Sequence, residues 1–263
     1  MSKKKVRQRI VIVSDLHCGH RAGLTPPDHW QHGTSYYAQQ KKTWDFYEKA
    51  IKSLQPIDIL LCNGDAIDGK GDRSGGTEIY ESDRQKQAKI AKECLEISKA
   101  KQYIIVAGTP YHVGAKEDFE RQLAWDLGTE LEGHAFFKVN GVKFDAAHMI
   151  GSSGAPHTRY TALARSKLWN SIWAIKKGQP NSDIIIRSHV HYFLYAGDSS
   201  WLGIITPALQ GFGSKYGVRQ CQGTVDFGLV WVDVYEDGTF DWGHKVMEYS
   251  LVEKNGRFES RLG

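Results

Sequence analysis

The chain has 263 residues, of which 41% are hydrophobic and 24% are charged. These values are typical of a soluble globular protein and exclude wholesale disorder, and no apolar run approaches the ~20 residues of a membrane span. Five of the 34 basic residues and no acidic residue lie in residues 1–9, so residues 10–263 have a net charge of 29 − 30 = −1. We expect a basic tail over residues 1–9, which is more simply a solvated terminus than a nucleic-acid arm, and a single domain over residues 10–263.

The first half of the chain alternates short apolar runs with helical patterns. Strands are predicted at residues 9–14, 57–62 and 103–107, and helices at residues 43–54, 81–101 and 116–127. This alternation is typical of an α/β protein with parallel strands.

The second half begins with a hairpin signal, because Asn140-Gly141 suits a two-residue turn between strands at 136–139 and 142–147. A helix at 160–177 and a strand at 183–187 follow. Residues 201–250 have only strand patterns, with a second turn at Asp237-Gly238. We therefore expect mixed sheets.

Four scattered cysteines, Cys18, Cys62, Cys94 and Cys221, form no C-x-x-C pair. This arrangement argues against a thiolate zinc site, a redox motif and a disulfide framework. We expect four small packing residues in a reducing, cytoplasmic protein, since the start of the chain also lacks the apolar core of a secretory signal.

A polar motif follows each of five predicted strands. Parallel strands place their carboxyl ends at one edge of a sheet, so these side chains would converge although they span nearly 180 residues. The motifs contain Asp15 and His17, Asn63 and Asp65, Thr109 and His112, His148, and His189 and His191.

Carboxylate and imidazole ligands together suit Mn, Fe, Zn, Co or Ni. Two acids and four or five histidines are too many for one ordinary metal, but they suit two ions roughly 3.5–4 Å apart with a bridging carboxylate. Such a pair clamps a phosphoryl group and generates a hydroxide that attacks phosphorus. Taken alone, each of these residues is explained more simply as a turn residue or a hydrogen-bonded histidine. The metal hypothesis rests on the whole set in its order along the chain.

The five motifs resemble those of the calcineurin-like metallophosphoesterase superfamily, D-x-H, G-D, G-N-H, H and G-H-x-H, in that order. The resemblance covers roughly residues 10–192. It implies two mixed sheets packed as a sandwich between helices, a four-layer α/β/β/α fold. The strands of residues 225–250 could extend a second sheet or form a dimer edge, and the resemblance favours the second sheet. It also implies a dinuclear phosphoesterase, with Mn as the first expectation and Fe, Zn, Ni or Co as alternatives.

Carried over to this sequence, the resemblance gives each residue a role. Asp65 would bridge the two ions, and His112 would protonate the leaving group or stabilise the phosphoryl group, with Asp68 or Asp118 as its support. The remaining ligands would be Asp15, His17 and His191 at one ion and His148 and His189 at the other.

Two positions depart from the superfamily pattern. Thr109 stands where the pattern has an asparagine ligand, so Thr109 itself, a water or a nearby residue such as Asn63 would fill that place. Ser188 replaces the glycine of G-H-x-H, which is a mild steric change.

Long loops could contact a phosphate ester through Arg73, Arg159 and Lys215. With no evident cap, an open cleft favours a phosphodiester, nucleotide or nucleic-acid substrate, and a phosphomonoester is the alternative. A second hypothesis is a non-catalytic metal- or nucleic-acid-binding module of the same fold, motivated by Thr109. We expect no membrane partner, and the sequence leaves the oligomeric state open.

Overall fold

The computed structural model describes residues 7–71, 75–113, 118–153, 155–212, 225–254 and 257–262, the last two strands by their backbone. The candidate residues Arg73 and Lys215, together with Cys221 and tail residues 1–6, lie outside the described residues. Cys18, Cys62 and Cys94 are buried and free, as packing residues would be.

The first sheet has six strands in the order β11-β10-β1-β2-β3-β4. Its neighbours β1 to β4 are parallel, whereas β10 and β11 run antiparallel at one edge. These strands are β1 (Arg7–Val13), β2 (Ile59–Asn63), β3 (Gln102–Val106), β4 (Leu131–Glu132), β10 (Gly228–Tyr235) and β11 (Phe240–Val246).

The second sheet has five strands in the order β5-β6-β7-β9-β8. Its three central strands are parallel, and the expected hairpin at Asn140-Gly141 joins β5 to β6. The strands are β5 (Ala135–Val139), β6 (Val142–Ala146), β7 (Ile184–Arg187), β8 (Leu194–Asp198) and β9 (Trp201–Ile205).

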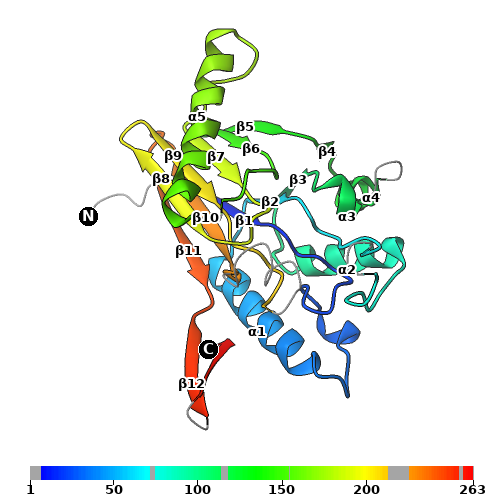
Figure 1. Ribbon diagram of the computed structural model, residues 1–263. Coiled ribbons are helices and arrows are strands. Elements are labelled where there is room, and N and C mark those ends of the chain that lie inside the picture. The colour runs from blue at the N-terminus through cyan, green and yellow to red at the C-terminus, as the bar shows by residue number, and fades with distance from the viewer. Residues whose placement is uncertain are drawn as a thin grey trace, which may run out of the picture.

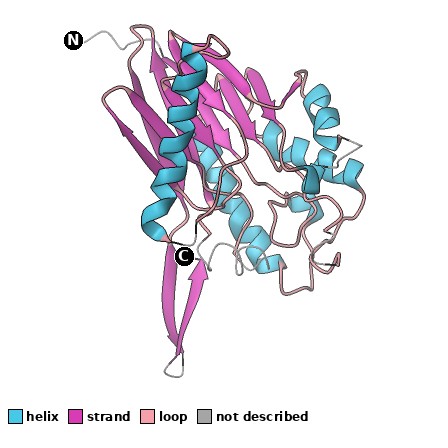
Figure 2. Cartoon of the chain, turned by 45° about the horizontal axis from the view of Figure 1, so that its top comes forward, coloured by secondary structure: helices cyan, strands magenta, loops and turns pink. Residues whose placement is uncertain are grey.

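Helices cover the outer face of each sheet (Figures 1 and 2). They are α1 (Tyr37–Leu54), α2 (Arg84–Glu96), α3 (Pro110–Val113), α4 (Phe119–Asp126) and α5 (Arg159–Ile175), with 3-10 turns η1 (Pro27–His29) and η3 (Pro156–Thr158). Helix α2 begins later than expected because the Asp83 side chain accepts hydrogen bonds from the Gln85 and Lys86 amides and so caps its start, and it also ends earlier, at Glu96.

Three apolar layers hold this arrangement together, and β1 shows how one strand serves two of them. Val11 and Val13 pack with α1 and α2, whereas Ile10 and Ile12 point into the layer between the two sheets. Alternate side chains of a strand face opposite sides, so a strand buried on both faces reads as a continuous apolar run. A third layer joins Leu163 of α5 to the second sheet. The four-layer sandwich expected from the resemblance is confirmed.

Two expectations about the strands are wrong. The strands of residues 225–250 were expected to extend the second sheet, but β10 pairs with β1 and belongs to the first sheet. Strands β12 (Tyr249–Lys254) and β13 (Arg257–Leu262), which pair with each other and project from the body, and strand β8 were not expected. Alternation identifies a strand but not its partner.

The basic tail expected over residues 1–9 also differs, because its last three residues already belong to β1. Arg7 and Arg9 both pair with the buried carboxylate of Asp233 on β10, at 2.8 and 2.6 Å. These two ion pairs therefore stabilise the pairing of β1 with β10. No helix among the described residues is long and apolar enough to cross a bilayer.

Candidate metal centre

The polar motifs meet where the central strands of the two sheets end. Asp15 and His17 follow β1 and Asp65 follows β2, whereas His148 follows β6 and the His189–His191 segment follows β7. Backbone hydrogen bonds tie these loops together, from the Asp15 amide to the Gly64 carbonyl and from the Ser188 amide to the His148 carbonyl, both at 2.9 Å. The site therefore takes its side chains from both sheets.

The backbone at this edge is unusual. Asp15, His17, Asp65, His189 and His191 have φ angles of 52°, 47°, 51°, 76° and 56°. Residues other than glycine rarely adopt this left-handed backbone conformation, because it costs energy. Residues that do adopt it are concentrated at functional sites. Five of the six side chains expected to bind metal thus stand on strained residues.

Two glycines allow the loops to approach closely. A Cβ atom on Gly64 would lie 2.4 Å from His148 Nδ1, and one on Gly108 would lie 2.1 Å from an Asp65 oxygen. Both distances are shorter than any real contact of that kind. The small residues beside the motifs are therefore needed for packing at the site.

The first cluster contains Asp15, His17 and His191, all with 2% or less of their surface exposed. Asp15 Oδ1 lies 3.2 Å from His191 Nε2 and 4.0 Å from His17 Nε2, and the two imidazole nitrogens lie 3.3 Å apart. One carboxylate oxygen and two ring nitrogens thus converge on a single point.

The second cluster contains Asp65, His148 and His189. His148 Nε2 lies 3.0 Å from Asp65 Oδ2 and 3.9 Å from Asp15 Oδ1, so the two clusters adjoin. His189 is half-buried, and its ring packs edge-on against that of His148 with centroids 5.3 Å apart.

Hydrogen bonds fix the orientation of the rings. His17 Nδ1 donates to Asp68 Oδ1 at 2.8 Å, and His148 Nδ1 donates to the Asn63 carbonyl at 2.7 Å. Each ring therefore presents Nε2 to the centre. Histidine ligands of metals are usually held this way by their other nitrogen.

His112 lies on the short helix α3 at the margin of the same centre. Its Nδ1 donates to the Asp68 carbonyl at 2.8 Å, and its Nε2 lies 4.0 Å from Asp65 Oδ2. Of the two expected supports, Asp68 contacts His112, whereas Asp118 caps α4 by accepting from the Arg121 amide.

The electrostatics favour ionised carboxylates and two neutral imidazoles. Burial would raise the pKa of Asp15 and of Asp65, but the neighbouring histidines hold both pKa values below the usual range. Burial lowers the pKa of His17 to about 4 and also lowers that of His189. Burial also opposes the charge on His148, but Asp65 and Asp15 outweigh it and raise its pKa to about 10.

These residues have the chemistry to hold a divalent cation. Asp15 Oδ1 is completely buried and accepts no hydrogen bond from the described residues, although three ring nitrogens surround it at 3.2–4.0 Å. A buried carboxylate oxygen without a partner is costly unless a cation completes its surroundings. The donor set of carboxylates and imidazoles suits Mn, Fe, Zn, Co or Ni.

Thr109, at the position of the expected asparagine ligand, contacts the carboxylate of Asp65. Its amide donates to Oδ1 at 2.6 Å, and its hydroxyl lies 2.9 and 3.0 Å from the two oxygens. In this structure Thr109 therefore orients the carboxylate expected to bridge the ions.

Asn63, the other candidate for that place, uses its amide nitrogen in a buried chain of polar groups. It donates to Ser188 Oγ at 2.6 Å, and the Ser188 hydroxyl lies 2.7 Å from that of Thr206, which in turn lies 2.7 Å from Ser14 Oγ. This chain joins the ends of β1, β2, β7 and β9, so the serine that replaces the pattern's glycine connects the two sheets.

Glu120 is the residue that sequence reasoning missed. Its completely buried carboxylate accepts from the Ala66 amide at 2.6 Å and from the Gly108 amide at 2.7 Å. Burial and the nearby Asp65 raise its pKa to about 8. The signal was an acidic residue on the apolar face of a helix, because Glu120 shares the helical spacing of Leu123 and Ala124.

Arg159 is the one described member of the three candidate substrate contacts. It begins α5, and its guanidinium lies over the ring of Tyr192 at 4.2 Å, next to His191. Two histidines outside the motifs have partners that suit packing or surface roles, His134 with Asp145 and His29 with Glu93.

Comparison with known proteins gives matches among solved structures. No family model and no curated protein matches the chain. A double mutant of Vps29 from Entamoeba histolytica is 14% identical, with 97% of each chain covered and a TM-score of 0.48. Vps29 from Cryptosporidium parvum is 12% identical over 98% of this chain and 97% of its own, with a TM-score of 0.46. A novel archaeal phosphodiesterase is 12% identical over 90% of this chain and 100% of its own, with a TM-score of 0.44.

Proposed function

We propose that this chain is a calcineurin-like metallophosphoesterase that hydrolyses a phosphate ester at a pair of divalent cations. The observation that carries the proposal is the meeting of six side chains from four strand-end loops in two adjoining clusters, in the order of the superfamily motifs. The buried Asp15 Oδ1, which accepts no hydrogen bond from the described residues, supports it independently of the motif order.

Asp15, His17 and His191 would hold one ion, and His148 and His189 the other, with Asp65 between them. When bound, the ions would neutralise phosphoryl charge and lower the pKa of a water to about 7. Mn is the first candidate metal.

His112 would act on the leaving group. Its Nδ1 is fixed by the Asp68 carbonyl, so its Nε2 faces the centre and can donate a hydrogen bond or a proton to an ester oxygen. Thr109 and Glu120 would keep Asp65 and its loop in place. Arg159 could contact a phosphate at the margin.

The substrate class favoured is a phosphodiester, including a nucleotide or a nucleic acid. The direct experiment measures hydrolysis of bis(p-nitrophenyl) phosphate and of p-nitrophenyl phosphate in Mn²⁺, for wild type, Asp65→Asn and His112→Ala. Diester turnover should vanish in Asp65→Asn and fall ~10²–10⁴-fold in His112→Ala with its metal content unchanged. The exposed Asp45→Asn is the matched control and should keep full activity.

Turnover of the monoester alone would instead indicate a phosphomonoesterase. A second candidate is a non-catalytic metal- or nucleic-acid-binding module, which Thr109 in place of an asparagine ligand favours. It predicts one metal or none per chain and no turnover in any divalent metal. Removal of residues 1–6 separates the two, because it leaves β1 intact. An enzyme keeps its turnover, whereas a module that binds nucleic acid through the tail loses affinity.

A further inference from the structure

The outer side of α5 carries large apolar side chains that are exposed. Leu168, Trp169, Trp173 and Ile175 have 60%, 55%, 49% and 82% of their surface exposed. Leu163 and Asn170 are the residues of this helix that are buried. With about 3.6 residues per turn, Leu168, Ile172 and Ile175 lie on the side opposite to Leu163. We call these five residues, 168, 169, 172, 173 and 175, the α5 face.

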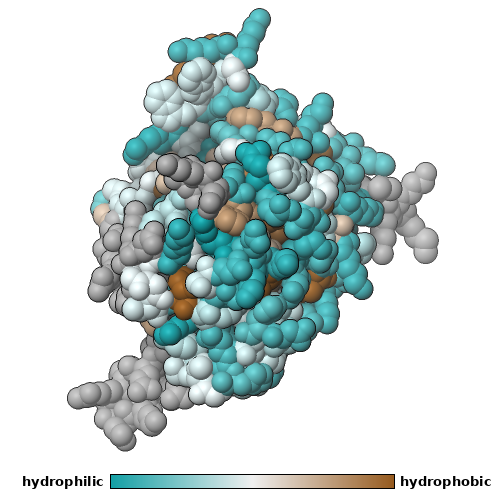
Figure 3. Space-filling view, turned by 90° about the vertical axis from the view of Figure 1, so that its right-hand side faces the viewer, coloured by the Kyte–Doolittle hydropathy of each residue, from teal (hydrophilic) through white to brown (hydrophobic). Residues whose placement is uncertain are grey.

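Such a face needs an explanation. A helix that is apolar around most of its circumference is normally buried, and a contiguous exposed apolar patch usually marks an interaction site. The side of the molecule that carries α2 to α4 differs, because it is mostly hydrophilic, with small and separate apolar spots (Figure 3).

The segment of the chain that contains α5 carries charge of one sign only. Residues 146–182 contain no aspartate or glutamate, whereas Arg165, Lys176 and Lys177 are exposed on or beside the face. Two copies of this helix placed directly against each other would therefore repel. The occupant of the face should be acidic as well as apolar.

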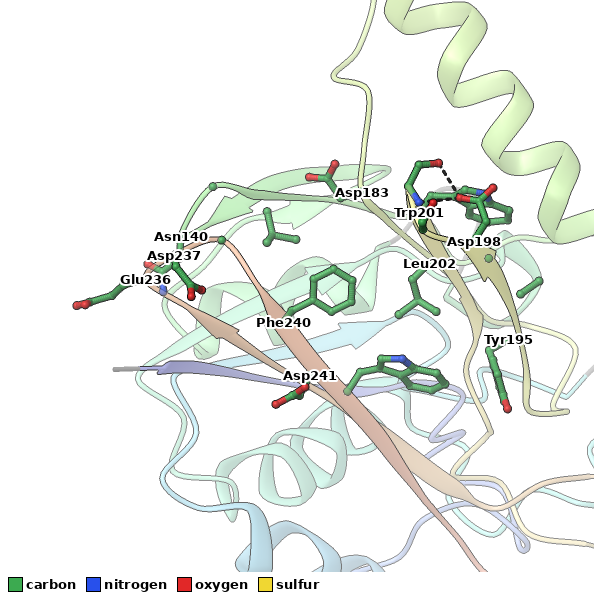
Figure 4. A pocket seen from close by; sticks show the side chains of 18 residues that line it. Asn140, Asp183, Tyr195, Asp198, Trp201, Leu202, Glu236, Asp237, Phe240 and Asp241 are labelled. Atoms are coloured by element: carbon green, nitrogen blue, oxygen red, sulfur yellow. Dashed lines mark hydrogen bonds between the residues drawn. The ribbon is translucent and has the colours of Figure 1, made fainter. Parts of the chain in front are cut away.

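This chain has a groove with that chemistry. It has a volume of about 1190 Å³ and lies between β8 and β11, with turns from both sheets at its end (Figure 4). None of the described residues that line it is a lysine or an arginine. Its carboxylates are Asp183, Asp198, Glu236, Asp237 and Asp241, and its aromatic residues are Tyr195, Trp201, Phe240 and Trp242.

The groove lies next to helix α5 on the molecule. Helix α5 packs on β8 and β9, two strands whose residues line the groove, and it passes beside the groove at the upper right of Figure 4. Lys167 of α5 donates to Asn181 Oδ1 at 2.9 Å and to the Ser182 carbonyl at 2.7 Å, directly before Asp183 of the groove in the sequence. The two surfaces can therefore form parts of one larger interface.

We propose that the α5 face of one copy docks into the acidic groove of a second copy, and that the two-fold symmetry of the pair repeats this contact. The basic, apolar helix and the acidic, aromatic groove are complementary in charge and in apolar character. A two-fold interface uses both surfaces of each copy, which doubles the buried area toward the roughly 1,600 Å² of a standard interface. An anionic membrane suits the chain less well, because five carboxylates lie next to the helix.

The first experiment measures the association of the full chain by sedimentation equilibrium over about 1–100 μM. Wild type should dimerise, and Trp169→Ala with Trp173→Ala should raise the dimer Kd about 100-fold. Trp125→Ala on α4 is the matched control, because Trp125 is also 55% exposed, and it should leave the Kd unchanged. Circular dichroism shows that each variant is folded.

The second experiment exchanges the charges. Lys176→Glu with Lys177→Glu, and separately Glu236→Lys with Asp237→Lys, should each raise the dimer Kd about tenfold or more. A mixture of the two double variants should restore association, because each contact again joins opposite charges. Lys86→Glu with Lys89→Glu on α2 controls for net charge.

Three results would overturn the proposal. The first is a monomeric wild type at every concentration, and the second is a dimer that none of the α5 or groove variants weakens. The third is a monomer that sediments with vesicles of anionic phosphatidylglycerol through the same tryptophans, which would assign the α5 face to a membrane. None of these readouts depends on phosphoesterase activity.

Discussion

Five residues expected to bind metal share one backbone property. Asp15, His17, Asp65, His189 and His191 all have positive φ angles, which are uncommon for residues other than glycine. Such strain persists only where the surroundings enforce it. At this edge of the sheets, the close-packed glycines, the hydrogen bonds between loops and the buried chain of polar groups keep the backbone in this conformation.

This strain predicts that glycine stabilises the protein more than alanine does at position 189, which is the reverse of the usual order. In metal-free protein, His189→Gly should be more stable than His189→Ala by about 1 kcal/mol, because glycine adopts a φ of 76° without a steric penalty. Urea unfolding of the two variants measures the difference. At His148, whose φ is not positive, alanine should be the more stable residue, and the same order at both positions would contradict the explanation.

Glu120 gives a second test at the scale of one residue. In Glu120→Gln, one side-chain oxygen replaces two, so either the Ala66 or the Gly108 amide loses its acceptor. We expect a loss of about 1–3 kcal/mol in unfolding free energy and a 10–100-fold loss in metal affinity. Calorimetric metal titration measures the affinity. The exposed Glu132→Gln should change neither quantity, and an unchanged affinity in Glu120→Gln would show that this carboxylate does not position Asp65.

The sequence predicted the candidate ligands better than their surroundings. Asp15, Asp65 and His148 follow apolar runs, and both chemistry and position point to them. Glu120 and Thr206 act through tertiary contacts. The local pattern marks Glu120 as an acidic residue on an apolar helix face, but it does not identify the partners of either residue. Thr109 was expected near a metal, and only the structure shows that it contacts Asp65.

At the scale of elements, a buried ionic cluster joins the second sheet to α5. Asp145 of β6 accepts from Arg187 of β7 at 2.6 Å, from His134 at 2.7 Å and from Asn170 of α5 at 3.0 Å. Burial would raise the pKa of Asp145, but His134 and Arg187 outweigh it and hold the pKa below its usual range. The charged form of this carboxylate therefore stabilises the fold.

The cluster predicts how stability depends on pH. A lowered native pKa means that the contribution is complete above the unfolded pKa, near 3.8, and is lost as the pH falls through the native value. At pH 7, Asp145→Asn should cost about 3–5 kcal/mol, because Arg187 stays buried without its counter-charge. Urea unfolding at pH 7 and below pH 4 should show that the difference from wild type narrows. A difference that is constant with pH would assign the effect to packing alone.

Element boundaries were predictable where local chemistry sets them. The turns at Asn140-Gly141 and Asp237-Gly238 and the strand before Asp15 appear where expected. The placement of β10 was not predictable, because both faces of this strand are buried and an apolar run does not choose between two sheets. In the structure, the ion pairs of Arg7 and Arg9 with Asp233 join β10 to β1 and so to the first sheet.

At the scale of the whole molecule, the candidate ligands come from both sheets, so bound ions would connect the two halves of the sandwich. Any ion that binds the native state more tightly than the unfolded chain stabilises it. At a concentration of 100 times Kd this effect is about 2.7 kcal/mol, or a rise of roughly 5–10 °C in Tm.

Thermal unfolding with and without chelator tests this connection. Removal of metal should lower the Tm of wild type by that amount and should have little effect on Asp65→Asn, which lacks the carboxylate proposed to be shared by the two ions. An equal shift in both proteins would show that the stabilising ions bind elsewhere.

The division of the candidate ligands between two sheets gives the apolar layer between them a further role. Asp15, His17 and Asp65 are fixed to one wall of this layer, and His148, His189 and His191 to the other. Ile12, Phe144 and Ile186 pack between the two sheets. The volume of these side chains therefore sets the distance between the candidate ligands of one sheet and those of the other. Interiors as dense as this transmit small changes in volume. A substitution that enlarges or shrinks a side chain in this layer would therefore change the distances between the candidate ligands without altering any residue at the centre itself.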